Sequence, residues 1–192
     1  MVVGLRPERG GFIRAFGCGW FIREFLLGHG PEGSKRIDPD EGAPQTDIFD
    51  EYKSALLRSF ARDSVERLEE ARIRAGKGAF TEAEYQSQLE YFLERIPRKF
   101  TRMRYSSFCR YFGHLQRLKW VEKSGKTETS AFQEKYPPAP PRIFYRLTDA
   151  GRAASDAEWS NPLITLYPNL FNLDYFRARN KEHKYYRQPK KV

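Results

Sequence analysis

The feature that most restricts how this chain can fold is a series of three apolar stripes at helical spacing, separated by residues that end helices. The first stripe spans residues 47–75 and stops at a pair of glycines. The second spans 82–96, opens on the capping box of Thr81 and Glu84, and stops at a proline. The third spans 106–118. We therefore predict a mainly α-helical chain built around three consecutive helices.

Two short segments of alternating apolar and polar residues follow the third stripe. They span 119–123 and 142–147, and their length and pattern are typical of half-buried strands. A long connection with a proline-rich run separates them, so we expect an antiparallel hairpin with an extended loop. Thr148 then caps a short helical turn. The predicted fold class is mainly α with a small antiparallel β-hairpin (α+β).

The segment before the first helix has an aromatic part and a linker. The aromatic part contains Trp20, Phe21 and Phe25 and is either two short strands around a glycine turn or a helix weakened by glycines; we favour the helix. These side chains either form a docking knob for a partner or pack on the chain's own core, and we favour the core. An acidic linker rich in proline and glycine completes this first part, residues 1–46.

Two further parts follow along the chain. Residues 47–154 form the domain of helices and hairpin. Residues 155–192 begin with an apolar segment punctuated by prolines, which we expect to wrap on the core, and end in a basic tail that contains aromatic residues.

Positive charge is concentrated in two places. The 192-residue chain has 34 Lys and Arg against 25 Asp and Glu, a formal net charge of +9. Residues 98–123 carry eight bases against Glu122 alone, and residues 174–192 carry seven bases against two acids. Such islands are either the electrostatic footprint of a polyanion partner or solvated basic faces. Because hydrophobic residues make up 40% of the chain, a wholly disordered basic protein is excluded.

The third helix has two distinct faces. At 100° per residue, one side of the helix, which we assign to the core, contains Phe108, Tyr111, Phe112, Leu115 and Leu118. The opposite sector contains Ser106, Arg110, Gly113 and Arg117. Ser106 or Ser107 is the expected helix cap.

The order of these elements resembles a winged helix-turn-helix. Residues 114–122 are similar to the end of the recognition helix in PadR- and MarR-type transcription regulators, and residues 145–152 are similar to the wing strand and the Leu-Thr-x-x-Gly-Arg turn of those families. The Pro140-Pro141-Arg142 run is similar to the PadR pattern. The match covers residues 105–153 and implies a winged helix domain with N- and C-terminal extensions.

The resemblance also implies a function, which is binding of double-stranded DNA by a transcription regulator or an architectural factor. It places Arg110 and Arg117 at base edges in the major groove, with Ser106 near the helix start at phosphate or base. It assigns the positioning of phosphates to a further set of bases. These are Arg102, Arg104, Lys119, Lys123, Lys126 and Arg142.

Aromatic residues alternate with bases in the C-terminal tail, a composition that suits stacking on nucleotides. The predicted nucleic-acid contacts there are Arg177, Arg179, Lys184, Tyr185, Tyr186 and Arg187. The other interpretation is that Tyr175 and Phe176 complete the core, and we favour it for the first half of the tail.

Two other partners fit the sequence. The winged helix could instead dock on RNA or protein in a ribonucleoprotein or protein assembly. The long first helix could form the seam of a homodimer, or it could be buried within one chain.

An enzyme is the least favoured class. The sequence has no glycine-rich phosphate loop, no metal-ligand spacing and no nucleophile with a candidate base, so we predict no catalysis, cofactor or metal. The apolar stretch of residues 12–27 is too short and too charged to cross a membrane. With only two cysteines, we expect an intracellular protein, cytoplasmic or nucleoid-associated.

Overall fold

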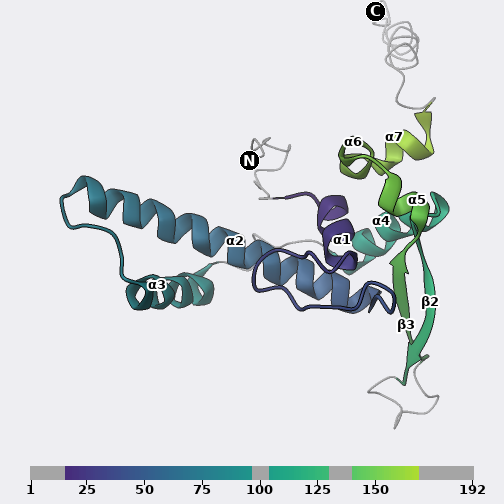
Figure 1. The fold of residues 1–192 in the computed structure, drawn as a ribbon, viewed down its shortest axis with the longest axis horizontal. Helices are drawn as coiled ribbons and strands as arrows, with labels where there is room; N and C mark the ends of the chain where they lie inside the picture. The colour runs from purple at the N-terminus through teal and green to yellow at the C-terminus, as the bar shows by residue number, and fades with distance from the viewer. Residues whose placement is uncertain (1–15, 97–103, 130–139, 169–192) are drawn as a thin grey trace, which may run out of the picture.

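The computed structural model describes residues 16–96, 104–129 and 140–168. These residues form a mainly helical chain with a small antiparallel sheet (Figure 1). The three predicted helices are confirmed as α2 (Gln45–Arg74), α3 (Glu82–Arg95) and α4 (Tyr105–Arg117).

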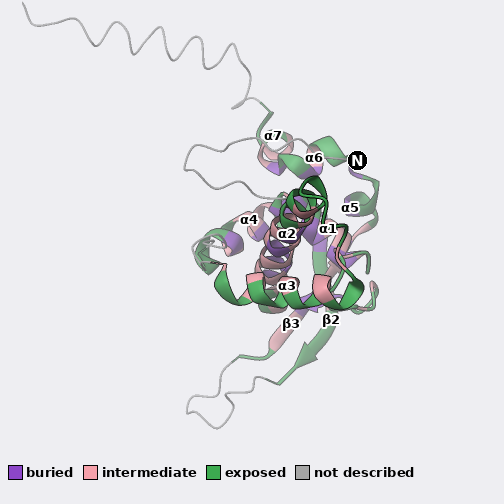
Figure 2. Cartoon of the chain, turned by 90° about the vertical axis from the view of Figure 1, so that its left-hand side faces the viewer, coloured by how far each residue is buried: buried purple, intermediate pink, exposed green. Residues whose placement is uncertain are grey.

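Helices α2 and α3 form a hairpin that extends away from the rest of the molecule (Figure 1). The predicted capping box begins α3: the Thr81 backbone N–H donates to Glu84 Oε2 at 2.8 Å, and the Glu84 N–H donates to Thr81 Oγ1 at 3.3 Å. These bonds lower the pKa of the Glu84 carboxyl. No residue of α3 is fully buried, as Figure 2 shows by its green and pink colours. We call residues 61–95 of this hairpin the arm.

The aromatic N-terminal part forms helix α1 (Cys18–Leu26), which confirms the preferred interpretation. Phe21 and Phe25 are almost fully buried and stack with ring centroids 5.5 Å apart, so they belong to the core as expected. Trp20 is on the other side of the helix and remains 39% exposed.

The sheet has three strands in the order β1-β3-β2, all antiparallel: β1 (Ala43–Pro44), β2 (Val121–Glu128) and β3 (Arg142–Leu147). The hairpin is as predicted, but the expected bounds of its first strand, 119–123, were wrong. The strand begins later because residues 119–120 form the turn that ends α4. It continues to Glu128 through polar, mostly exposed residues, which backbone pairing with β3 and ion pairs of Lys126 and Glu128 hold in place, and no apolar alternation signals this part of the strand.

Strand β1 was not predicted, since a two-residue strand has no periodic pattern. It pairs with β3 through Ala43 opposite Tyr145 and Pro44 opposite Phe144. Gly42 makes this close approach possible: its φ is +72°, and a Cβ there would lie 1.9 Å from the Tyr145 carbonyl oxygen. The acidic linker is therefore attached to the sheet.

Within the described residues, three short helices follow β3: α5 (Asp149–Ala153), α6 (Asp156–Ser160) and α7 (Pro162–Leu166). Thr148 caps α5 as predicted. Trp159 is 1% exposed, its ring centroid lies 4.9 Å from that of Trp120, and its indole N–H donates to the Gly151 carbonyl. The apolar wrap is confirmed for Trp159 and Pro162, which are buried, whereas Ile164 and Tyr167 are 46% and 36% exposed. Residues 169–173 lie outside the described ranges.

One core joins α1, the first half of α2, α4 and the sheet, and it appears as the purple interior in Figure 2. Within the described residues, no helix has both the length and the apolarity that crossing a bilayer requires.

Candidate nucleic-acid interface

The inner side of α4 fixes which side of the helix faces outward. Phe108, Phe112 and Leu115 are fully buried, as the helical spacing predicted. The ring of Phe108 lies 5.2 Å from that of Phe49, and Phe112 meets Tyr145 of β3 edge-on at 5.0 Å. Because aromatic rings anchor the helix on both α2 and the sheet, α4 cannot rotate without opening the core.

The start of α4 differs from the prediction. Arg104, not Ser106 or Ser107, is the N-cap residue, and no side chain caps the helix there. The helix begins earlier because Tyr105 already packs on Phe49, with ring centroids 5.2 Å apart. Ser106 consequently lies in the exposed first turn.

The end of α4 places Lys119 in an unusual backbone conformation. Lys119 has a φ of +56°, the left-handed region in which glycine normally ends a helix. Its N–H donates to the Gln116 carbonyl and the Trp120 N–H donates to the Leu115 carbonyl, both at 3.0 Å, which is a Schellman motif. Thr148 Oγ1 donates to the Lys119 carbonyl and holds the turn against α5. A lysine is therefore fixed at the exposed corner between α4 and β2.

The cations on and beside α4 are exposed to solvent. Arg104, Arg110, Arg117, Lys119 and Lys123 are all exposed, and no carboxylate of the described ranges forms an ion pair with any of them. Elsewhere in those ranges, most arginines are paired with carboxylates. They are Arg23, Arg58, Arg62, Arg72, Arg74, Arg95, Arg142 and Arg146. We call Arg104, Arg110, Arg117 and Lys119 the α4 basic face.

The C-terminal half of this face has one neutral contact. Arg117 Nη1 donates to the hydroxyl of Tyr167, just after α7, at 2.8 Å, which orients the guanidinium without neutralising it. His114, one turn from Arg110 and close to Arg117, has a buried Nδ1 for which no partner exists among the described residues. Partial burial, together with the positive charges of these two arginines, lowers the pKa of His114.

Gly113 lies in the same outward sector. A Cβ built on it meets no atom within 4 Å. Glycine inside a helix destabilises it by about 0.5–1 kcal/mol relative to alanine, and nothing in the described chain requires a glycine here. The α4 backbone is thus open to close approach from outside between Arg110 and Arg117.

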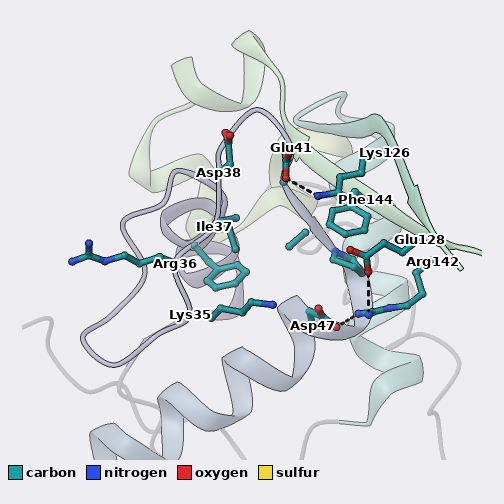
Figure 3. Close-up of a pocket in the computed structure, with 14 residues that line it drawn as sticks. Lys35, Arg36, Ile37, Asp38, Glu41, Asp47, Lys126, Glu128, Arg142 and Phe144 are labelled. Carbon is teal, nitrogen blue, oxygen red and sulfur yellow. Dashed lines mark hydrogen bonds and ion pairs between the residues drawn. The ribbon is translucent and has the colours of Figure 1, made fainter. Parts of the chain in front are cut away.

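The outer part of the hairpin differs from the α4 basic face. Lys126 Nζ lies 2.6 Å from Glu41 Oε2, and this bond raises the pKa of Lys126. Arg142 forms ion pairs with Asp47 and Glu128. These five residues, which we call the wing-base cluster, border a cavity of about 240 Å³ between the hairpin, the linker and the start of α2 (Figure 3). Two of the cations assigned to phosphates are thus neutralised by the chain itself.

Seven of the predicted site residues cannot be placed. Arg102 and the tail residues Arg177, Arg179, Lys184, Tyr185, Tyr186 and Arg187 lie outside the described residues, and so do Tyr175 and Phe176.

No protein-family model, no curated protein and no solved structure matches this chain. Its site must therefore be interpreted from its own geometry. In the ranges that the structure covers, His, Cys, Asp and Glu side chains do not gather in threes as metal ligands would.

Sequence reasoning missed the residues that modulate these cations. Glu41, Asp47 and Tyr167 are distant in sequence from the bases they contact. One signal was available, because residues 37–46 carry three acids and no base. This segment, interpreted above as a linker, could have been interpreted as the counter-charge of a basic hairpin.

Proposed function

We propose that the protein is a non-catalytic, winged helix-turn-helix DNA-binding protein, either a transcription regulator or an architectural factor. Helix α4 would enter the major groove of double-stranded DNA, with Arg110 and Arg117 at base edges and Ser106 at the helix start. Arg104, Lys119 and Lys123 would hold phosphates and set the orientation of the helix.

The observation that carries the proposal is the unpaired state of the α4 basic face. The described chain neutralises most of its arginines with its own carboxylates, yet it leaves three arginines and a lysine exposed around one helix. Concentrated cations without counter-charge repel one another and destabilise the fold slightly, unless a polyanion supplies the negative charge. Duplex DNA is such a polyanion, and each neutralised phosphate releases condensed counterions.

The shape of the region supports the same interpretation. Helix α4 has an open side at Gly113 and a β-hairpin beside its C-terminal end. A helix of this kind fits the width of a major groove, and the hairpin then lies beside a flanking strand of phosphates. The N-terminal end of α4 has no acidic residue in its first turn, so its free backbone N–H groups also favour an anion.

A binding selection on randomised duplexes tests the proposal, with the salt dependence of affinity recorded for the winning sequence and for bulk DNA. We expect enrichment of a defined sequence, bound more tightly than bulk DNA, and a log-log slope of affinity against salt that is steeply negative for both. An architectural factor would give the steep slope with little enrichment. Absence of duplex binding at low salt would refute the proposal.

A second candidate is a subunit of a ribonucleoprotein or protein assembly. The observation that favours it is the arm, where Leu68, Ile73 and Tyr91 are 40%, 51% and 47% exposed, a surface suited to a protein partner or a second copy of the chain. Competition between duplex DNA and structured RNA at matched salt separates the candidates, because tighter retention on RNA would favour this one.

A further inference from the structure

The wing-base cluster brings acids from one part of the chain onto bases from another. Glu41 lies in the linker and Asp47 in the first turn of α2, whereas Lys126 and Arg142 lie on the paired strands β2 and β3. The pairing of β1 with β3 and the tight turn at Gly42 hold the linker against the hairpin, so the acids are delivered to the bases by backbone structure. Figure 3 shows Glu41 directed at Lys126 and Arg142 between Asp47 and Glu128.

The two cations are bound differently. Lys126 has Glu41 as its ion-pair partner and also lies over the ring of Phe144, 4.7 Å from its centroid. Arg142 has two carboxylates, that of Asp47 and that of Glu128, the latter at 3.5 Å. Removing one acid should therefore release Lys126 more completely than Arg142.

The Lys126–Glu41 pair is open to solvent, and the Arg142–Asp47 pair is half-buried. The Lys126 and Glu41 side chains are 40% and 54% exposed, and those of Arg142 and Asp47 are 35% and 32% exposed. Exposed pairs contribute little to stability, because water screens them and the long side chains lose freedom. A phosphate of a duplex against the hairpin can replace such a carboxylate at small cost.

We propose that Glu41 and Asp47 limit the affinity of the hairpin for polyanions by occupying Lys126 and Arg142 as intramolecular substitutes for phosphate. This inference rests on the proposed function, since the polyanion is the DNA that α4 binds. The α4 basic face then provides the cations that are always available, and the wing-base cluster provides two that become available only when a phosphate displaces an acid.

The test is the duplex affinity of full-length Glu41→Gln and Asp47→Asn chains over a range of salt. Each substitution removes a competing charge and keeps the side-chain shape. We expect affinity for any duplex to rise about one-and-a-half- to fivefold, more for Glu41→Gln than for Asp47→Asn. The slope of log affinity against log salt should steepen by about 0.9 for each cation that gains a phosphate.

Two controls isolate the local effect. Glu90→Gln removes the same charge from the exposed surface of α3 on the arm, so it measures the influence of net charge alone. Lys126→Gln combined with Glu41→Gln forms a double-mutant cycle, in which the gain from Glu41→Gln should disappear because the released cation is absent.

Four results would overturn the inference. Three of them are unchanged affinity and slope in Glu41→Gln, an equal gain in Glu90→Gln, and a gain that persists without Lys126. Reduced affinity with a lower unfolding midpoint would also overturn it, because the acids would then only brace the hairpin. These failures differ from failure of the proposed function, in which the wild-type chain itself would bind no duplex at low salt.

Discussion

The α4 basic face and the wing-base cluster carry cations of the same kind, yet the chain treats them oppositely. Arg110 and Arg117 are exposed without a carboxylate partner in the described ranges, whereas Lys126 and Arg142 are held by acids. The acids come from 85 and 95 positions away in sequence. The density of bases along a sequence therefore measures charge, whereas the fold decides how much of that charge a partner can reach.

The difference has a local cause and a distant one. Within α4, no acid stands three or four residues from either arginine, so the helix itself offers no ion pair. In the hairpin, by contrast, β3 also pairs with β1, and β1 directly follows the acidic linker. Substitutions confined to one region therefore test whether the two sets of cations differ in their availability to a partner.

The largest effect is expected from Arg110→Ala and Arg117→Ala. Each should weaken binding to the selected duplex by about 1–3 kcal/mol and flatten the preference among sequences, because a bidentate guanidinium distinguishes guanine from other bases. Titrations of the selected and a randomised duplex at one salt concentration measure this. Arg67→Ala, which removes an exposed arginine from α2 within the arm, is the matched control and should leave both affinities almost unchanged. Equal losses on the two duplexes would contradict the assignment of base readout to α4.

Gly113→Gln should separate stability from binding. A Cβ at this position meets no atom within 4 Å, so the helix should gain about 0.5–1 kcal/mol of stability from the loss of glycine. On the duplex, the added bulk would stand between helix and groove and weaken binding by about 1–3 kcal/mol. Chemical denaturation and duplex titration of the same preparation give both quantities. An unchanged affinity would mean that this side of α4 does not face the polyanion.

Lys119→Gly should also raise the stability of the chain and weaken its binding to DNA, with a smaller effect on binding than Gly113→Gln. Glycine adopts the left-handed conformation without strain, so the free energy of unfolding should rise by about 1 kcal/mol. The lost cation should weaken binding to all duplexes alike and make the salt slope shallower by about 0.9. Lys119→Ala keeps the strained backbone, so it should reproduce the loss of affinity without the gain in stability. If Lys119→Gly destabilised the chain, the lysine side chain would have a structural role that the contacts do not indicate.

The smallest expected effect is the change in stability when His114 is protonated at acidic pH. Its pKa in the folded chain lies below the ordinary value of 6.5, so the unfolded chain binds the proton more readily. Stability should therefore fall as the pH is lowered through about 6.5 and stop falling below the folded pKa. Urea unfolding between pH 7 and 5 measures this, and His114→Gln should remove the dependence in that range. A stability that rises on acidification would show that His114 gains an acidic partner in the native chain.

Much of the fold could be predicted from the sequence, because local rules decide it. The three helices follow from apolar periodicity, and their ends follow from a capping box and from glycine and proline. The outward orientation of Arg110 and Arg117 follows from the anchoring of Phe108, Phe112 and Leu115 by the same periodicity. The cap of α4 and the start of β2 were predicted wrongly, since the contact of Tyr105 with Phe49 and the turn at Lys119 depend on packing.

The sequence by itself determined where the three helices α2, α3 and α4 lie, which face of α4 is basic, and that the excess positive charge is concentrated in two islands, because these properties depend on residues within a few positions of one another. Only the tertiary structure decided which cations remain available. It brought Glu41 and Asp47 onto Lys126 and Arg142 and, among the described residues, brought no acid onto the α4 basic face. An ion pair requires two charges within a few ångströms, and for residues so distant in sequence only the folded path of the backbone sets that distance.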